Sequence, residues 1–239
     1  MLMSFEQVSY TYPCNPKPTL RQLSLSIQPG QRYAVIGQNG CGKTTLFRLA
    51  NGLYRPSAGK VRWQNQSLRY NRPSLYHLRQ QVGLVFQNPE EQLVAATVEE
   101  DLSYGLCNLG LPDTEIEQRV QATLEAFELT DLADFPVNYL SLGQKKRLAI
   151  ADITILRPKL LLLDEPTAYL DPGQVRNLRN ILATIQATGT TLVIATHDLQ
   201  FVKDWADWVV VMHQGQVVME KTPTDIFSHQ HFLRGIGLS

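Results

Sequence analysis

The sequence of 239 residues has little cysteine, little charge and no long apolar run. Its three cysteines, Cys14, Cys41 and Cys107, are too few and too scattered for a disulfide framework or a zinc cluster. Apolar runs such as Leu160 to Leu163 fall far short of the ~20 residues that a membrane-spanning helix needs. We therefore expect neither a transmembrane helix nor a metal centre built from thiols.

The chain also lacks net charge, because 22 Lys and Arg residues balance 22 Asp and Glu residues. A neutral chain has no general attraction to nucleic acid, so any phosphate chemistry requires a local site. The N-terminus lacks the basic start and apolar stretch of a secretion signal, which predicts a cytoplasmic protein. Because the chain as a whole is neutral, the basic run Lys145-Lys146-Arg147 is interpreted as a solvated helix face.

The apolar pattern predicts an α/β protein. Near the N-terminus, Leu23, Leu25 and Ile27 alternate with polar residues, as in paired surface strands. Farther along, strands and helices alternate, which favours a mostly parallel sheet wound on both faces. The expected strands are 33–36, 61–63, 82–86, 160–163 and 191–195, the expected helices are 43–51 and 175–187, and a hairpin is expected at 208–219.

A helical region is predicted inside this α/β frame. Ile116, Val120, Leu124 and Phe127 recur at helical spacing after Asp113, which is interpreted as the N-cap. We expect one domain over residues 1–239, with a core and β-subdomain at about 1–87 and 158–239 and a helical subdomain at about 88–157.

A phosphate-binding loop is the strongest motif. Residues 37–44, Gly-Gln-Asn-Gly-Cys-Gly-Lys-Thr, match the pattern G-x-x-x-x-G-K-[ST] in full, between a predicted strand and a predicted helix. Its glycines let backbone N–H groups point at the β- and γ-phosphates, helped by the positive end of the helix. Lys43 adds a mobile charge, and the Thr44 hydroxyl is a candidate Mg²⁺ ligand. The flanking elements disfavour the alternative, an exposed glycine-rich turn.

Polar residues follow three other predicted strands. Asp164 and Glu165 end an apolar strand, and a carboxylate there is costly to desolvate unless a cation compensates it. Asp164 is therefore predicted to bind Mg²⁺ and Glu165 to face the γ-phosphate and a water, the alternative being a solvated strand end. Gln87 and His197 follow the other two strands, and ligands of open α/β sheets bind beyond such ends. We expect all these groups to meet at one site.

Ser141 begins a predicted helix that runs to about residue 156. Ser141 and Gln144 fit an S-x-x-Q capping box, which accounts for both residues locally. A helix N-terminus with a serine is also an anion site, so the residues alone leave both interpretations open.

In order and spacing, these motifs resemble those of ATP-binding cassette ATPases over nearly the whole chain. The Asn-Pro-Glu-Glu-Gln stretch after Gln87, followed by Thr-Val-Glu-Glu-Asp, looks like the energy-coupling factor subgroup, which drives uptake of vitamins and of cobalt or nickel. The matching segments are 37–45 (Walker A), Gln87 (Q-loop), 140–144 (signature), 160–165 (Walker B with the catalytic glutamate), 168–171 (D-loop) and His197 (switch histidine).

The resemblance implies a P-loop NTPase core with a mostly parallel sheet, an N-terminal antiparallel β-subdomain and an inserted helical subdomain. It implies two cassettes, of the same or related chains, that sandwich two ATP molecules with Mg²⁺, the signature of one closing over the phosphate loop of the other. The implied partners are a transmembrane coupling subunit and a substrate-binding membrane subunit. The chain is then peripheral on the cytoplasmic face of the membrane, and no nucleic acid is expected.

The same resemblance assigns roles to single residues. Glu165 polarises the attacking water, His197 holds the γ-phosphate, and Gln87 senses Mg²⁺ and water. Tyr12 stacks on adenine, with Tyr10 as a weaker candidate on the same strand face. The implied nucleotide-binding residues are Tyr12, Gly37, Gln38, Asn39, Gly40, Cys41, Gly42, Lys43, Thr44, Thr45, Ser141, Gly143, Gln144, Asp164 and Asp171, and the implied metal ligands are Thr44, Gln87 and Asp164.

Two residues depart from the family pattern. Leu142 replaces the second glycine of the usual signature, and at the first helical position its side chain can point outward, so we predict that activity survives. Gly143 is expected to let phosphate approach the backbone. Tyr169 in the D-loop has no physical account at this level.

Two other classes of cassette protein stay open. A soluble cassette acting on nucleic acid or ribosomes often carries a second cassette or a long basic insertion, and this sequence has neither. An exporter ATPase is disfavoured only by the stretch at residues 88–92.

Overall fold

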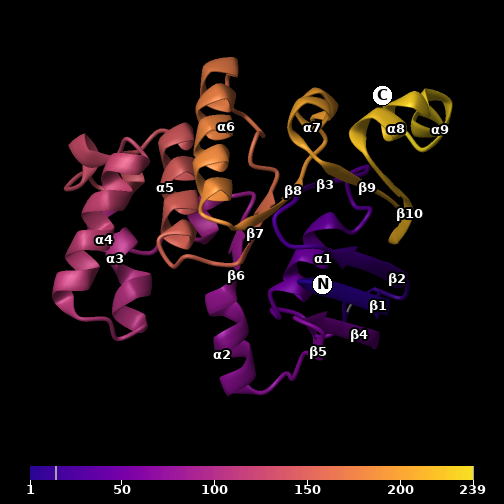
Figure 1. Ribbon diagram of the computed structural model, residues 1–239, viewed down its shortest axis with the longest axis horizontal. Helices are drawn as coiled ribbons and strands as arrows, with labels where there is room; N and C mark the ends of the chain where they lie inside the picture. Colours follow the sequence, from indigo (N-terminus) through magenta and orange to yellow (C-terminus); the bar gives the residue numbers. More distant parts are fainter. Residues whose placement is uncertain (14, 239) are drawn as a thin grey trace.

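A computed structural model describes residues 1–13 and 15–238, and Cys14 lies outside the described residues. The chain forms two β-sheets, with helices around the larger one (Figure 1). The predicted α/β class, with an antiparallel sheet and a mostly parallel sheet, is confirmed. Cys41 and Cys107 are free thiols. Over the described ranges, no helix is both long enough and apolar enough to cross a membrane.

The smaller sheet is antiparallel, in the order β2-β1-β4-β5. β1 does not alternate regularly, because Gln7 adopts a φ of 50° and the pairing register shifts between Phe5 and Val8. In β2, Leu23, Leu25 and Ile27 are buried and alternate with less buried polar residues, as predicted. Because β1 ends at Tyr10, Tyr12 lies in the following loop, and the prediction that the two rings share a strand face is wrong. The strands are β1 (Met3–Tyr10), β2 (Leu20–Ile27), β4 (Ala58–Trp63) and β5 (Gln66–Ser67).

The larger sheet has the order β10-β9-β3-β8-β7-β6, and only β10 is antiparallel to its neighbour. The carboxyl ends of β3, β6, β7 and β8 therefore meet at one edge. Its central strands are buried on both faces, which explains their continuous apolar runs. The strands are β3 (Arg32–Ile36), β6 (Val82–Val85), β7 (Leu160–Asp164), β8 (Thr191–Ala195), β9 (Trp208–His213) and β10 (Gln216–Lys221).

The helices gather around this sheet, with α3, α4 and α5 together on the side away from the small sheet (Figure 1). All three lie within the stretch predicted to be helical, and the division of the chain at residues 88 and 157 stays a prediction. The helices are α1 (Lys43–Ala50), α2 (Arg72–Gln81), α3 (Val98–Asn108), α4 (Asp113–Ala126), α5 (Leu142–Thr154), α6 (Pro172–Ala187), α7 (Leu199–Trp205), α8 (Pro223–Ser228) and α9 (Gln230–Gly235). Short 3₁₀ turns lie at Pro89–Glu91, Thr130–Leu132 and Val137–Tyr139.

Two predicted helix starts are wrong. Asp113 is the first helical residue of α4 rather than its cap, because Pro112 occupies the N-cap position and makes no side-chain bond. α6 begins at Pro172 instead of residue 175, because Asp171 caps it and a proline is favourable in the first turn.

Candidate functional site

The edge where the parallel strands end opens into a cavity of about 720 Å³. The phosphate-loop pattern and the three other strand ends, far apart in the sequence, thus contribute to one site, as the sequence predicted. Its lining residues are Tyr12, Thr19, Asn39, Gly40, Gly42, Lys43, Thr44, Thr45, Gln87, Asp164, Glu165, Ala168, Tyr169 and His197.

The loop between β3 and α1 has the backbone that its glycines predict. Gly40 and Gly42 adopt φ angles of +79° and +111°, which residues with a side chain rarely reach. Gly42 is also the N-cap of α1 and makes no side-chain cap bond, so no side chain competes for the donors of the first turn. These N–H groups and the helix dipole suit an anion in the cavity.

Three predicted residues of the phosphate loop do not line the cavity. They are Gly37, Gln38 and Cys41. A Cβ at Gly37 would lie 2.4 Å from the Met212 carbonyl oxygen, so close packing behind the loop requires glycine here. The Cys41 side chain is buried in the core, and burial raises the pKa of its thiol, which makes it a poor nucleophile.

Glu165 is held between two potential donors. Its Oε1 lies 3.7 Å from the Nζ atom of Lys43, and its Oε2 lies 2.8 Å from Nδ1 of His197. The Lys43 ammonium also donates to the Gly37 carbonyl at 2.8 Å. Only 7% of each of the Lys43 and Glu165 side chains is exposed, so each compensates the other's charge in a poorly solvated place.

Asp164 supplies an unused oxygen. Its Oδ1 is buried and has no hydrogen-bond partner within residues 1–13 and 15–238. Burial raises the pKa of Asp164, against the opposing effects of a hydrogen bond from Thr44 and the Lys43 charge. The unpaired Asp164 oxygen, the Thr44 hydroxyl and the Gln87 amide oxygen together form a set of oxygen ligands. Such a set fits Mg²⁺.

Of the two candidate tyrosines, Tyr12 reaches the cavity. Its hydroxyl lies 3.0 Å from Oγ1 of Thr45. Tyr10 does not line the cavity and instead stacks on Tyr54, with ring centroids 5.0 Å apart and an interplanar angle of 3°. The Tyr12 ring also makes T-shaped contacts with Tyr10 and Tyr54, at centroid distances of 5.1 and 5.7 Å, and of these three tyrosines it is the one that lines the cavity.

The signature residues lie outside the cavity, as does Asp171. Ser141 and Gln144 form the predicted capping box: the Gln144 N–H donates to Ser141 Oγ at 3.3 Å, and the Ser141 N–H donates to Gln144 Oε1 at 2.8 Å. Asp171 caps α6 by the same reciprocal pattern with Gln174, a D-x-x-Q signal that was readable in the sequence. Within this chain Ser141, Gln144 and Asp171 serve in helix caps.

The structure explains part of the unusual signature. Leu142 is the first residue of α5 and is 41% exposed, as predicted for an outward side chain. A Cβ at Gly143 would lie 2.4 Å from Nε2 of Gln174, so a side chain at this position would displace the end of the Gln174 side chain.

Lys146 is buried, so the prediction that it lies on a solvated helix face is wrong. It is 7% exposed, and its Nζ donates to the main-chain carbonyls of Glu165 at 3.3 Å, Pro166 at 3.4 Å and Ala168. Ala149 and Ile150 follow it at helical spacing and are buried, and this stripe was the signal that it faces inward. Burial lowers the pKa of the ammonium to about 8, although the Glu165 charge opposes the change.

The loop that Lys146 holds is unusual in its backbone. Glu165 has a φ of 47° and Tyr169 a φ of 63°, both in the left-handed region that non-glycine residues rarely occupy. Tyr169 is 85% exposed at the cavity, so it contributes surface there rather than packing. The lysine thus stabilises a strained segment that carries a cavity carboxylate.

Comparison with known proteins agrees with this geometry. The family model described as ABC transporter matches residues 20–168. An ABC transporter ATP-binding protein of Nostoc sp. (strain PCC 7120) is 59% identical over 237 residues, covering 99% of this chain and 86% of the relative. The energy-coupling factor transporter ATP-binding protein EcfA of Methanothermobacter thermautotrophicus is 39% identical over 237 residues, covering 99% of this chain and 76% of the relative.

Solved structures give the same result. CbiO1 of Clostridium perfringens, part of the ABC transporter complex cbiONQ, aligns with a TM-score of 0.87 and 38% identity over 99% of this chain and 94% of that one. The ATP-binding cassette MJ0796, solved as a dimer in a post-hydrolysis state with ADP and phosphate, aligns with a TM-score of 0.85 and 25% identity over 93% and 99% of the two chains. The chain therefore belongs to the ABC transporter family, as an ATP-hydrolysing cassette similar to the EcfA subunits of energy-coupling factor transporters.

Proposed function

We propose that this chain is the ATP-hydrolysing subunit of an energy-coupling factor importer. A dimer of cassettes, of the same or related chains, would couple MgATP binding and hydrolysis to uptake of a vitamin or of a transition metal such as cobalt or nickel. The membrane partners are a transmembrane coupling subunit and a substrate-binding subunit, and the chain lies peripherally on the cytoplasmic face. Support comes from the EcfA relatives, the CbiO1 neighbour and the Asn-Pro-Glu-Glu-Gln stretch after Gln87.

The observation that carries this proposal is the position of Glu165 above the phosphate loop. Its carboxylate is oriented by His197 at 2.8 Å and lies within reach of Lys43, in a cavity that the loop N–H groups line. A carboxylate so placed can orient and polarise a water toward a phosphate held by the loop. Lys43 would exchange its contact with Glu165 for the β- and γ-phosphates, which frees that carboxylate for the water.

The remaining residues have positioning roles. Thr44, Gln87 and Asp164 would hold Mg²⁺. When bound, this ion would neutralise part of the phosphate charge. Tyr12 provides a flat ring for adenine, and Asn39, Gly40, Gly42 and Thr45 line the phosphate end. Ser141, Gly143, Gln144 and Asp171 would act across the dimer, since none of them lines the cavity of its own chain.

Glu165→Gln tests the assignment of the water-polarising group. We expect the variant to bind ATP as the wild type does and to form an ATP-dependent dimer in light scattering. Its turnover should fall by roughly a hundredfold or more, the usual effect of losing such a group. Glu117→Gln, at an exposed position on α4, is the matched control and should hydrolyse ATP normally. Wild-type turnover of Glu165→Gln would remove this residue from its role.

The transport assignment needs a separate experiment. The chain is co-expressed with candidate membrane subunits, and uptake of labelled cobalt, nickel and vitamins is measured with wild-type protein and with Glu165→Gln. Uptake of one cargo that requires an intact Glu165 supports the importer. Stable binding to ribosomes or DNA, without association with a membrane subunit, would overturn it.

A further inference from the structure

The neutral net charge of this chain conceals a strong segregation of charge along the sequence. Residues 7–89 contain eleven Lys and Arg residues and no Asp or Glu, and Glu6 is the only acid before them. Residues 90–239 contain eleven basic and twenty-one acidic residues. The two parts of the chain therefore carry opposite net charges of about equal size. These charges cancel in the net charge of the whole chain.

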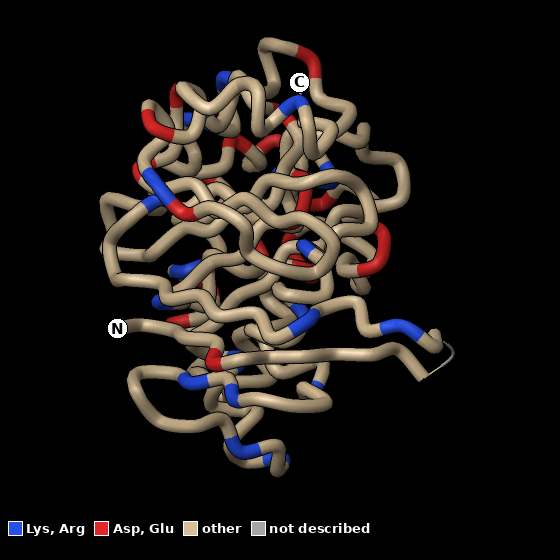
Figure 2. The backbone as a smooth tube through the Cα atoms, turned by 90° about the vertical axis from the view of Figure 1, so that its right-hand side faces the viewer, with Lys and Arg blue, Asp and Glu red and all other residues tan. Residues whose placement is uncertain are grey.

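Six of these basic residues gather at one end of the molecule, here called the basic face. Blue segments dominate this lower end in Figure 2, whereas red segments collect in the upper part. Five of the six side chains are exposed and Arg62 is half-buried, and Arg62 is the one that forms an ion pair with a described residue, at 2.5 Å from Glu6. The six residues, on β4, α2 and their flanking loops, are Arg55, Lys60, Arg62, Arg69, Arg72 and Arg79.

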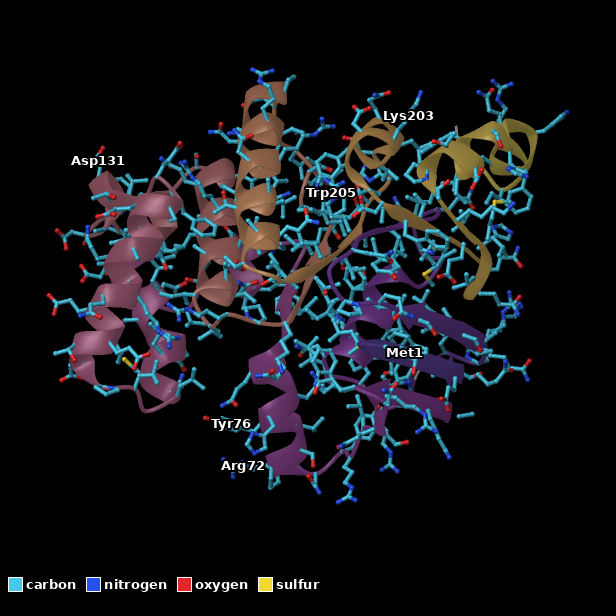
Figure 3. The ribbon with its side chains drawn as sticks, in the orientation of Figure 1. Met1, Arg72, Tyr76, Asp131, Lys203 and Trp205 are labelled. Carbon is cyan, nitrogen blue, oxygen red and sulfur yellow. The ribbon has the colours of Figure 1, made fainter. Side chains whose placement is uncertain are left out.

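The basic face includes a hollow of about 850 Å³ between β4, β5 and α2. Arg62, Arg69 and His77 line it, together with the amide and hydroxyl side chains of residues 65–67. Guanidinium groups beside neutral hydrogen-bond donors are suited to phosphate oxygens. Figure 3 shows Arg72 at the lower end of α2. None of the six basic residues lines the nucleotide cavity, so the basic face is separate from that site.

We propose that the basic face binds the anionic headgroup surface of a lipid bilayer. The proposal rests on the proposed function for the nearness of a membrane and adds a direct contact with lipid, besides the contacts with membrane subunits. Clusters of four to eight Lys and Arg residues suit anionic leaflets, and each such residue near the surface strengthens binding by about fivefold. The contact weakens with salt, because the charges are exposed and screened within a Debye length of about 8 Å.

A bilayer fits this charge distribution better than a nucleic acid does. A bilayer presents a plane that meets one end of the molecule and stays away from the rest. A long polyanion would extend past the basic face toward the part of the chain with twenty-one acids, which repels it.

The test is co-sedimentation of the purified full chain with lipid vesicles that contain no protein. Vesicles of phosphatidylcholine alone are compared with vesicles containing 40% phosphatidylglycerol, the fraction being about that of a strongly anionic leaflet. The triple variant Lys60→Gln, Arg69→Gln, Arg72→Gln removes three exposed charges. The control triple variant Lys203→Gln, Lys221→Gln, Arg234→Gln removes the same charge from α7, β10 and α9, distant from α2 in Figure 1.

We expect the wild type to bind only the anionic vesicles and to be released as salt is raised. The triple variant of the basic face should lose about a hundredfold in partition coefficient, and the control should stay within about threefold of wild type. Equal binding to both kinds of vesicle, or equal losses in the two triple variants, would overturn the proposal. So would a 30-base-pair DNA duplex that binds more tightly than the vesicles and loses affinity in the basic-face variant.

Nucleotide binding is measured on the same samples. ATP affinity that is lost in Lys43→Ala and kept in both triple variants supports the proposed function independently of lipid. A chain that binds ATP but no anionic vesicle contradicts only the lipid contact, and one that binds vesicles but no ATP contradicts only the proposed function.

Discussion

Replacing Lys146 with Met tests whether a buried ammonium in α5 holds the Glu165 loop. Methionine keeps the length of the side chain and removes the donors to the carbonyls of Glu165, Pro166 and Ala168. Because the segment contains two residues with positive φ, we expect it to relax toward ordinary backbone angles when these bonds are lost. The Glu165 carboxylate would then lose its position relative to the phosphate loop.

The effect on overall stability should be small, since two large contributions oppose each other. A pKa lowered from 10.5 to about 8 means that keeping the charge buried costs about 3 kcal/mol. Three hydrogen bonds from a charged donor, two of them long at 3.3 and 3.4 Å, contribute roughly 5 kcal/mol in the other direction, and the carbonyls recover part of this from water once the loop relaxes. We therefore expect the free energy of unfolding to change by no more than about 2 kcal/mol, while turnover falls by roughly tenfold through misplacement of Glu165.

The assays separate a positioning effect from a folding defect. ATP affinity should stay within about twofold, because the phosphate loop is untouched, so the loss appears in kcat. Hydrogen exchange should accelerate at the amides of Ala168 and Leu170, which donate to the carbonyls of Glu165 and Thr167 at 3.2 Å. Lys203→Met, at an exposed lysine of α7, is the control and should change neither quantity.

The lowered pKa adds a signature in pH. Between pH 8 and 10.5 the unfolded chain holds a proton on Lys146 that the folded chain has released, so this group makes stability rise with pH there. Turnover should nevertheless fall above pH 8, because the neutral amine has one donor fewer for its three carbonyls. Lys146→Arg, which stays charged, should lack that fall. Wild-type kcat and unchanged amide exchange in Lys146→Met would refute the reasoning.

Two further predictions concern α5. Burial and the neighbouring Asp101 carboxylate raise the pKa of Asp152 well above its usual value, so the stability due to this proton is present below about pH 4 and is lost as pH rises toward the folded pKa. Asp152→Asn should remove this loss, and melting curves at pH 5 and 8 check it; equal pH dependence of variant and wild type contradicts it. Gly143→Val should abolish turnover of the assembled complex and lower the melting temperature, since its side chain meets Gln174, whereas Leu142→Gly should keep turnover within about twofold. Adding Gln174→Ala to Gly143→Val removes this contact but also the capping box of α6, so it should restore the melting temperature only in part, and restored turnover would refute a role for Gly143 beyond packing.

The main features of the fold and cavity were predictable because they depend on local rules. A loop with glycines at fixed positions needs no tertiary information, and polar residues after apolar strands converge once the strands are parallel. This is why Lys43, Gln87, Asp164, Glu165 and His197 line one cavity. The outward side chain of Leu142 followed in the same way from its position at the start of a helix.

The sequence does not predict four short helices or the burial of Lys146, because both depend on which segments pack together. α2, α7, α8 and α9 have six to ten residues each, too few for helix propensity alone to stabilise them, so contacts with the rest of the chain decide them. In a chain of zero net charge, the basic run Lys145-Lys146-Arg147 predicts a solvated helix face. The burial of Lys146 became evident only with the loop after β7 packed beside α5, since three carbonyls there need a donor.

Helix α5 carries a residue for each of the two sites that the proposed dimer requires: Ser141 for the partner's nucleotide and Lys146 for the Glu165 loop of its own chain. Ser141 caps α5, and Lys146 lies five residues farther on, about 7 Å along the helix axis. A shift of α5 that brings Ser141 to a nucleotide of the partner chain therefore also moves the donor that holds the Glu165 loop of its own chain. Neither end can move alone, because a helix of this length is nearly rigid and Lys146 is buried. In Lys146→Met we therefore expect the dimer to form with ATP as usual but without raising turnover, and a normal dimer-dependent rise would contradict this link.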